Sequence, residues 1–439
     1  MEWTPHRIIL TSYLVAILLG SLLLYLPFST TKPISYIDAL FTSTSAITVT
    51  GLVVLDTEKD FTLFGKLVIL TLIQLGGLGY MTLSTYFFIT LGRRIGLRER
   101  LMLAEAFNYP GMYGLVRFTK RMLPVIFFIE FVGAFVLFPF FLFELKEPSL
   151  AFFSALFHSV SAFNNAGFSI FSDNLVKFRG DIGINLVIIL LIILGGLGFY
   201  VIYELLLYRM GEVRRISTHT KLVLITSFIL IVLGSAGLLL DISRWSDLSL
   251  KEKIMASVFH SVSARTAGFN TIDIGKLSEP SKFLLVILMF IGASPGGTGG
   301  GIKTITAAVI FLAVLSYTRG FQEVRVFGRR LVDAQIHRAM VILSLAFGYT
   351  TFMAFLLSEV EKQKLLPTLF EVVSAFSTVG LSVGNPQGLS LSADFSPVGK
   401  LLIILTMVVG RVGILSFMFA LAGKEKVSHV KYPEARVLL

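Results

Sequence analysis

The chain has 439 residues and a net charge of +11, and 55% of its residues are apolar, with no cysteine among them. The lack of cysteine excludes disulfides and thiolate metal sites. A composition this apolar is typical of a membrane protein. A helix needs roughly 20 apolar residues to cross a bilayer core, and eight stretches reach that length, near residues 8–27, 63–90, 121–143, 182–208, 219–241, 281–317, 337–358 and 397–422.

The first stretch is predicted to remain a membrane helix, since it exceeds a signal-peptide core and no small-residue cleavage site follows it. Eight spans place both termini on one side of the membrane. Lys and Arg are more frequent in the connections on that side, near residues 92–121, 209–221 and 319–338, and in the tail. The positive-inside rule makes this side cytoplasmic. The excess charge is thus a topology signal and a docking face, and it requires no nucleic acid as partner.

One short motif recurs four times along the chain. The copies are Ser45-Ala-Ile-Thr-Val-Thr-Gly-Leu52, Ser161-Ala-Phe-Asn-Asn-Ala-Gly-Phe168, Ser263-Ala-Arg-Thr-Ala-Gly-Phe269, which is one residue shorter, and Ser374-Ala-Phe-Ser-Thr-Val-Gly-Leu381. An aromatic residue opens the short apolar run before each copy: Phe41, Phe157, Phe259 and Phe370. A run of about ten residues extends about 15 Å as a helix and reaches only halfway through a bilayer. Each copy is therefore predicted to be a re-entrant loop, which is tolerated at membrane depth where it lines water or is buried in protein.

This spacing predicts four fused units, each with a span, a half-helix, a turn and a second span. The predicted fold is an all-α polytopic membrane protein with eight transmembrane helices and four re-entrant half-helices around one pore. We expect one domain of residues 1–439, with units at about 1–92, 117–211, 217–320 and 335–423, and a cytoplasmic tail at 424–439.

The four turns are predicted to form a selectivity filter. A dehydrated cation needs its water oxygens replaced, and a ring of backbone carbonyls does this. Glycine permits the backbone conformations that such a ring requires, and each half-helix points the negative end of its dipole at the centre. Ordinary tight turns after a helix are the alternative, which four copies make less convincing. The predicted K⁺-binding filter residues are Thr48, Val49, Thr50, Gly51, Asn164, Asn165, Ala166, Gly167, Arg265, Thr266, Ala267, Gly268, Ser377, Thr378, Val379 and Gly380.

The sixth span is interrupted by a Gly-rich stretch between residues 291 and 304. Pro295 and five nearby glycines prevent a continuous helix, and a broken helix inside a membrane must line a cavity. A phosphate-binding loop would need Gly-Lys-Ser/Thr, whereas Gly301 is followed by Ile302 before Lys303. The stretch is therefore a candidate gate.

Several polar residues lie within the predicted spans and half-helices. Arg265, beside the third turn, is predicted to be structural and to pair behind the filter with a carbonyl or with an acid such as Asp38 or Glu371. His158 and His260 are predicted to be hydrogen-bonded packing residues.

Arg411, Glu130 and Glu204 are further charged residues within the predicted spans. A charge at mid-span is functional by default; Glu204 can reach the inner interface, and no partner for Glu130 follows from the sequence. The segments Gly76-Gly-Leu-Gly79 and Gly195-Gly-Leu-Gly198 are interpreted as small residues that allow close helix packing.

With its four filter turns, the Gly-rich insertion after the third and the arginine in the last span, the chain resembles the superfamily of bacterial Trk and Ktr and plant HKT potassium transporters. It is most similar to the membrane subunit (KtrB type) of a Ktr potassium uptake system, because it begins at the first unit without the additional N-terminal spans of the Trk type.

The resemblance implies a passive, gated pore for potassium uptake in the cytoplasmic membrane. It also implies a homodimer with one pore in each protomer, and a cytoplasmic ring of nucleotide-binding regulatory subunits, expected to dock at Arg325, Arg329, Arg330 and the tail. The intramembrane loop would block the pore, with an arginine facing the pore as a barrier; a buried structural pair is the alternative for that arginine. The gate residues carried over in this way are Gly296, Gly297, Thr298, Gly299, Gly300, Gly301, Lys303 and Arg411.

Three alternatives remain. A sodium-coupled or sodium-permeant transporter of the same superfamily is the first. A serine in place of the first-unit glycine accompanies sodium transport in the plant relatives, and all four positions here are glycine, which favours potassium. An intramembrane enzyme would need a catalytic dyad or metal cluster that these residues do not supply, so no enzyme and no covalent cofactor are expected. A transporter with inverted repeats fits four repeats in the same direction poorly. Potassium is the expected substrate, and stimulation by sodium stays open.

Overall fold

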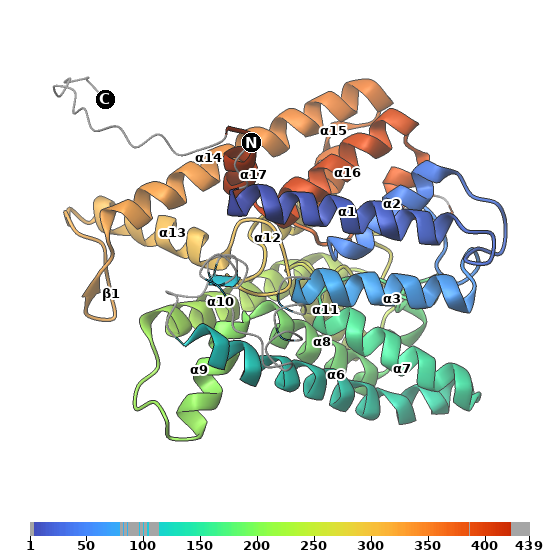
Figure 1. The fold of residues 1–439 in the computed structure, drawn as a ribbon, viewed down its shortest axis with the longest axis horizontal. Coiled ribbons are helices and arrows are strands. Elements are labelled where there is room, and N and C mark those ends of the chain that lie inside the picture. The colour runs from blue at the N-terminus through green and yellow to red at the C-terminus, as the bar shows by residue number, and fades with distance from the viewer. Residues whose placement is uncertain are drawn as a thin grey trace.

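The computed structural model describes residues 4–79, 114–385 and 387–422, with isolated positions between 82 and 104. Helices lie side by side, mostly along the long axis of the molecule (Figure 1). The basic connection near residues 92–121 falls largely outside the described residues, and so does the predicted cytoplasmic tail at 424–439.

The fold consists of four fused units of span, half-helix and second span. The first spans are α1 (Pro5–Tyr25), α6 (Leu115–Leu145), α10 (Thr218–Ile242) and α14 (Asp333–Glu361). The half-helices are α2 (Tyr36–Ile47), α7 (Pro148–Phe163), α11 (Leu250–Ser263) and α15 (Leu365–Phe376). The second spans begin with α3 (Leu63–Leu78), α8 (Ile182–Gly196), α12 (Glu279–Phe290) and α16 (Pro397–Val412), and three of them continue after a break as α9 (Phe199–Arg209), α13 (Thr304–Thr318) and α17 (Ile414–Ala422).

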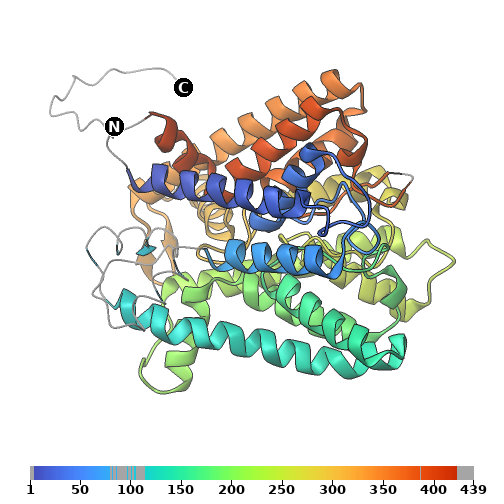
Figure 2. The same ribbon diagram turned by 45° about the vertical axis from the view of Figure 1, so that its right-hand side comes forward.

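The units close into a ring. The second span of each unit packs on the half-helix of the next: α3 on α7, α8 on α11, α12 on α15, and α16 back on α2. Figure 2 shows α3 between α1 and the pair of α6 and α7. Since the last contact joins the fourth unit to the first, the four half-helices surround one axis.

Local sequence signals fix where many of these helices begin. Side-chain oxygens of Ser35, Thr62, Asp181 and Ser217 cap the first turns of α2, α3, α8 and α10, as expected for N-cap residues. Ser249 and Glu252 form a full capping box on α11. These caps satisfy backbone N–H groups that have no partner within the helix.

The outer surface of the first spans is apolar. Large side chains exposed on α6 include Phe128, Phe131 and Phe135, and α1 exposes Leu18 and Leu19. A band of this kind on several long helices is what a lipid-facing surface requires. Among the described residues four helices are long and apolar enough to cross a membrane, and two bent pairs also pass that test.

Two of the predicted continuous spans are in fact sharply bent. The stretch predicted at 182–208 divides into α8 and α9, which meet at 98°, and the stretch at 397–422 divides into α16 and α17, which meet at 99°. Gly198 and Gly413 lie at the breaks with φ of 95° and 88°, a conformation that glycine adopts without steric cost. The predicted interruption of the sixth span is confirmed, because residues 291–303 separate α12 from α13.

The interpretation of the two Gly-Gly-Leu-Gly segments as packing residues was therefore incomplete. A Cβ on Gly76 would lie within 3 Å of the carbonyl of Ile47, and one on Gly195 equally near the carbonyl of Phe163. These two glycines do allow a span to touch the end of a half-helix. The last glycine of each segment also lies at a helix boundary: Gly79 is the C-cap of α3 with φ of 76°, and Gly198 is the N-cap of α9 with φ of 95°.

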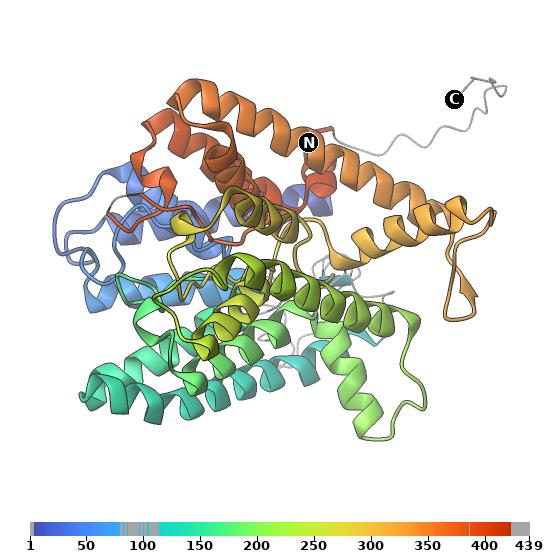
Figure 3. The ribbon, with the colours of Figure 1, turned by 180° about the vertical axis from the view of Figure 1, so that it is seen from behind.

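A short hairpin of β1 (Arg325–Val326) and β2 (Arg329–Arg330) projects from the end of the molecule that also carries α9 and the end of α13 (Figure 3). Phe327 and Gly328 form its turn with φ of 48° and 73°, a pair of positive values typical of tight hairpins. The hairpin was not predicted, since a two-residue strand carries almost no sequence signal.

Packing between span and half-helix gives a stability prediction. A Cβ on Gly234 of α10 would lie within 3 Å of Ser261 and Leu288, so Gly234→Val should destabilise the protein by about 1–3 kcal/mol and lower its unfolding temperature in detergent. Gly348→Ala on α14 is the control, because no atom lies within 4 Å of that position and Ala favours a helix by about 1 kcal/mol over Gly. Equal unfolding temperatures for Gly234→Val and wild type would contradict this packing.

Candidate functional site

The four motif turns share one backbone conformation. Each contains a left-handed residue two positions before its glycine: Val49, Asn165, Thr266 and Thr378, with φ of 50°, 55°, 77° and 50°. The glycines follow with φ of 88°, 68°, 80° and 94° for Gly51, Gly167, Gly268 and Gly380. Left-handed conformations are costly for residues with a Cβ, so the same strained pattern in four places indicates a shared demand on the backbone.

The glycines of successive turns touch in a cycle. A Cβ on Gly51 would lie within 3 Å of Ala166 O, and the same holds for Gly167 with Ala267 O, Gly268 with Val379 O, and Gly380 with Thr50 O. The order runs from the first turn through the second, third and fourth and returns to the first. The turns therefore meet as four walls around one axis, with carbonyl oxygens at the contacts.

A serine on each half-helix holds its turn in place. Ser45 Oγ accepts from the N–H of Gly51 at 3.0 Å and donates to Leu52 O at 2.7 Å. Ser374 accepts from the N–H of Gly380 at 3.0 Å, and Ser161 and Ser263 donate to the carbonyls that follow their own glycines. The serine that opens every motif copy thus anchors the returning chain.

The third turn fits the ring despite its missing residue. In the other three copies the serine carbonyl accepts from an N–H five positions later; the N–H of Thr50, for example, donates to Ser45 O at 2.8 Å. In the third, Ser263 O accepts from Ala267 N, four positions later, also at 2.8 Å. The deletion falls before the left-handed Thr266, so the residues that face the next turn keep their register.

Arg265 points away from this ring. It is 8% exposed, and its guanidinium donates to the hydroxyl of Ser227 on α10 at 3.0 Å and to the carbonyl of the same residue at 3.4 Å. The predicted pairing with a carbonyl is thus present, but the two suggested acids were wrong. Asp38 binds Lys400 at 2.7 Å, and Glu371 accepts hydrogen bonds from Ser382 and Ser392.

The half-helix histidines are fully buried and hydrogen-bonded, as predicted. His158 Nδ1 contacts Ser154 O at 2.8 Å, and its Nε2 contacts Ser169 Oγ at 2.9 Å. His260 repeats this with Ala256 O and with the N–H of Thr271. Both rings tie a half-helix to the chain that leaves its turn.

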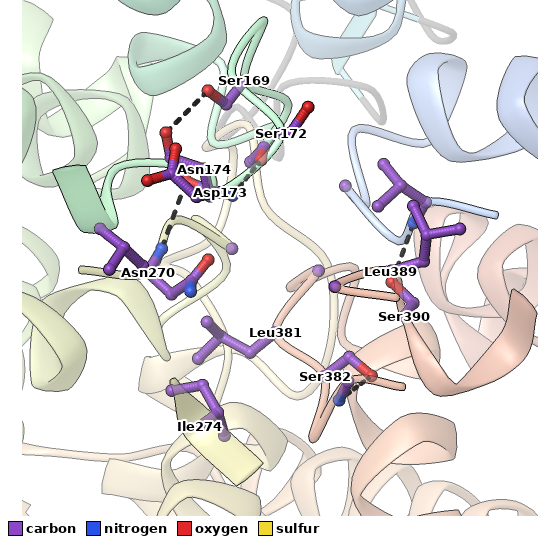
Figure 4. A pocket seen from close by; sticks show the side chains of 18 of the residues that line it. Ser169, Ser172, Asp173, Asn174, Asn270, Ile274, Leu381, Ser382, Leu389 and Ser390 are labelled. Carbon is purple, nitrogen blue, oxygen red and sulfur yellow. Dashed lines mark hydrogen bonds between the residues drawn. The ribbon is translucent and has the colours of Figure 1, made fainter. Parts of the chain in front are cut away.

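A cavity of about 530 Å³ lies on the side of the ring where the chain leaves the turns. Its lining includes the glycines of all four motif turns and, five or six residues after them, Asp56, Asp173, Asp273 and Asn385. Figure 4 shows the second, third and fourth units converging on it. Carboxylates in a confined mouth raise the local concentration of cations.

Asp56 is held ionised within this mouth. Burial raises the pKa of its carboxyl, but hydrogen bonds from Ser172 and from the backbone N–H groups of Glu58 and Lys59 outweigh burial, so the pKa lies below its ordinary value. Ser172 belongs to the second unit and donates to Asp56 at 2.6 Å. The same bond thus joins two units at the rim.

On the other side of the ring, the loop of residues 291–303 lies directly beneath the turns. The N–H of Gly300 donates to Thr378 Oγ1 at 2.8 Å. A Cβ on Gly299 would come within 3 Å of Thr266, and one on Gly301 within 3 Å of Ser377. The loop needs glycine because it packs against the side chains of the third and fourth turns.

Arg411 joins this loop to the first unit. Its guanidinium donates to Thr298 O in the loop and to Gly76 O at the end of α3, and its Nε lies 3.3 Å from the hydroxyl of Tyr13. Lys303 closes the loop on itself by donating to Gly299 O at 2.6 Å. The predicted gate residues from Thr298 to Lys303 are therefore brought together with Arg411 on this side of the four turns. Gly296 and Gly297 lie against the break between α8 and α9.

The two acids within spans have partners that the sequence did not reveal. Glu130 accepts from Gln74 at 3.1 Å and from Asn164 at 2.9 Å. Glu204 accepts from Ser217 and Thr220 at the start of α10. Long-range partners of this kind depend on how the units pack, so a sequence pattern could not identify them.

Comparison with known proteins gives a consistent result. Residues 6–429 match the family described as TrkH, cation transport protein. The chain is 39% identical to Ktr system potassium uptake protein B of Bacillus subtilis, over 100% of this chain and 97% of that protein, and 38% identical to the protein of the same name from Vibrio alginolyticus, over 98% and 94%. It is 34% identical to potassium/sodium uptake protein NtpJ of Enterococcus hirae, over 99% and 97%.

A solved structure shares the fold. The crystal structure of the potassium transporter TrkH from Vibrio parahaemolyticus aligns with a TM-score of 0.70 at 21% identity, covering 94% of this chain and 85% of that one.

The ring geometry predicts that one methyl group added at a motif glycine weakens cation binding. Gly268→Ala would place a Cβ against the carbonyl of Val379 at φ of 80°, so binding of Rb⁺ to the purified protein, measured by calorimetry, should weaken at least about tenfold as the carbonyl ring distorts. Gly388→Ala in the outer cavity is the matched control, since its φ is 82° but no atom lies within 4 Å. If both variants bound Rb⁺ as tightly as wild type, the ring would not be the cation site.

Proposed function

Since the chain belongs to the TrkH family of cation transport proteins, we propose that it takes up potassium ions across the cytoplasmic membrane through the ring of four turns. The cyclic contact of Gly51, Gly167, Gly268 and Gly380 carries this proposal. Four strained turns meeting on one axis at membrane depth have no evident packing purpose. They do supply carbonyl oxygens that can replace the water around a dehydrated cation.

The electrostatics of the path support a cation as cargo. Asp56, Asp173 and Asp273 line the outer cavity, and each half-helix ends at the ring, so that the negative ends of four helix dipoles converge there. Arg265, the basic residue nearest the third turn, is bound to Ser227 behind the ring. An ion would gather in the outer cavity, lose water at the carbonyls and continue toward the loop.

We propose that residues 291–303 are the gate and that Arg411 holds it closed. The loop fills the space beneath the third and fourth turns, and the guanidinium fixes it to the carbonyl end of α3. Opening would require Arg411 to release Thr298 O. A loop built largely from glycine can move at little steric cost.

The names of the relatives support potassium as the substrate, because two of them are potassium uptake proteins. The relative from Enterococcus hirae is named for both potassium and sodium, which keeps a sodium-permeant or sodium-coupled transporter as the second candidate. Glycine at all four filter positions favours potassium. Stimulation by sodium is compatible with both the potassium transporter and the sodium-permeant or sodium-coupled transporter.

The arrangement in the membrane follows the same proposal. Both termini would be cytoplasmic, and the units would occupy about residues 1–92, 117–211, 217–320 and 335–423 of one domain. The protein would form a homodimer in the lipid bilayer with one pore in each protomer.

The regulatory partner would be a cytoplasmic ring of nucleotide-binding subunits, which the designation of the relatives as parts of a Ktr system supports. The exposed arginines of the hairpin, Arg325, Arg329 and Arg330, are the proposed docking residues together with the tail. Reversing their three charges should abolish co-purification of the ring, and a complex that survives the reversal would contradict this docking.

Uptake of K⁺, Rb⁺ and Na⁺ by cells that lack their own uptake systems tests the function. Wild type should restore K⁺ uptake, and Arg411→Gln should raise the flux roughly tenfold, since the loop loses hydrogen bonds to a charged group. Arg7→Gln is the matched control, because Arg7 also binds a backbone carbonyl, that of Ala420 at 2.9 Å, outside the path. Equal uptake of Na⁺ and K⁺ by wild type would favour the second candidate, and no flux of either would refute the pore.

A further inference from the structure

Glu130 has no role in the pore described so far, although it is a carboxylate in the middle of a span. It lies on α6, is 4% exposed and is bound by two amide side chains. Gln74 Nε2 donates to both carboxylate oxygens at 3.1 Å, and Asn164 Nδ2 donates to one at 2.9 Å. Burying a carboxylate in this way is costly unless donors satisfy it, and these donors come from two other helices.

Comparison of the units shows that this carboxylate is a departure from the repeat. In three units a half-helix serine donates to a carbonyl of the first span: Ser43 to Ile17 O, Ser159 to Glu130 O and Ser261 to Ile231 O. The equivalent position is thus isoleucine in the first and third units. A buried acid is not needed to pack a span against a half-helix in this fold.

One partner of Glu130 lies beside the second filter turn, and the other lies near the Arg411 contact of the gate. Asn164 is the C-cap of α7 and directly precedes the left-handed Asn165 of the second turn. Gln74 lies on α3 just before Gly76, whose carbonyl binds Arg411. Asn164 and Gln74 also bond each other at 3.0 Å.

We propose that Glu130 is a positioning residue that holds the second filter turn and the end of α3 in one fixed arrangement, and so couples ion discrimination at the filter to the Arg411 contact of the gate. This inference rests on the proposed function. Removing the carboxylate weakens the hold on Asn164 and on α3 together. The filter then discriminates less between cations, and the gate contact loosens.

The test uses ⁸⁶Rb⁺ flux into proteoliposomes with competing Na⁺ for the full-length protein. Glu130→Gln should reduce the discrimination of Rb⁺ over Na⁺ roughly tenfold, since a hydrogen bond to a charged acceptor is lost. It should also make the effect of Arg411→Gln smaller than in wild type. Glu204→Gln is the matched control, because Glu204 is a buried span carboxylate bonded to Ser217 and Thr220, away from the filter, and it should leave discrimination unchanged.

Exchanging the Gln74 and Glu130 side chains distinguishes a positioning role of Glu130 from a contribution to stability alone. The double variant Gln74→Glu with Glu130→Gln keeps one carboxylate and one amide beside Asn164, so it should restore discrimination close to wild type. Asn164→Ser, which introduces the residue that the fourth turn carries as Ser377, should reproduce the loss seen with Glu130→Gln. These two variants decide the matter if Glu130→Gln alone does not fold.

The outcomes of this experiment distinguish a failure of the Glu130 proposal from a failure of the proposed function. A wild type that conducts no Rb⁺ refutes the pore itself. A wild type that conducts, with unchanged discrimination in Glu130→Gln or in Asn164→Ser, overturns only the role of Glu130, and so does a folded exchange variant that remains unselective.

Discussion

The structure depends on the close approach of four backbone turns at membrane depth. At each contact a glycine faces the carbonyl oxygen of the next turn with no space for a Cβ, as between Gly380 and Thr50. Backbone without regular structure is tolerated inside a bilayer only where it is buried in protein or lines water. Every unit must therefore provide a half-helix that delivers the turn, a serine that anchors it and a neighbouring span that covers it.

The helices can be understood from this requirement. In the first, second and fourth units the second span passes the end of a half-helix so closely that only glycine fits, as at Gly76 against Ile47 O and at Gly410 against Phe376 O. In the second, third and fourth units the spans then bend or break, and the third unit uses its break for the 291–303 loop. Arg411 occupies the corresponding place in the fourth unit and reaches across to Thr298 and Gly76.

Much of this architecture could be predicted from the sequence, because the evidence is periodic or repeated. Apolar runs identify spans, and four copies of one motif identify the turns. The bends at Gly198 and Gly413 were missed because the apolar runs continue through them. The partners of Arg265 and Glu130 were missed for another reason: they lie on other helices, so only the packing of the spans brings Ser227 to one and Gln74 to the other.

The central claim is that the four turns together bind a dehydrated potassium ion. The most direct test is a crystal structure of the protein in Rb⁺, recorded at the rubidium absorption edge to give an anomalous map. The account predicts a peak on the axis, surrounded by carbonyl oxygens of the turns that contain Gly51, Gly167, Gly268 and Gly380. A well-ordered ring with no peak on its axis, or a peak held by side chains elsewhere, would contradict it.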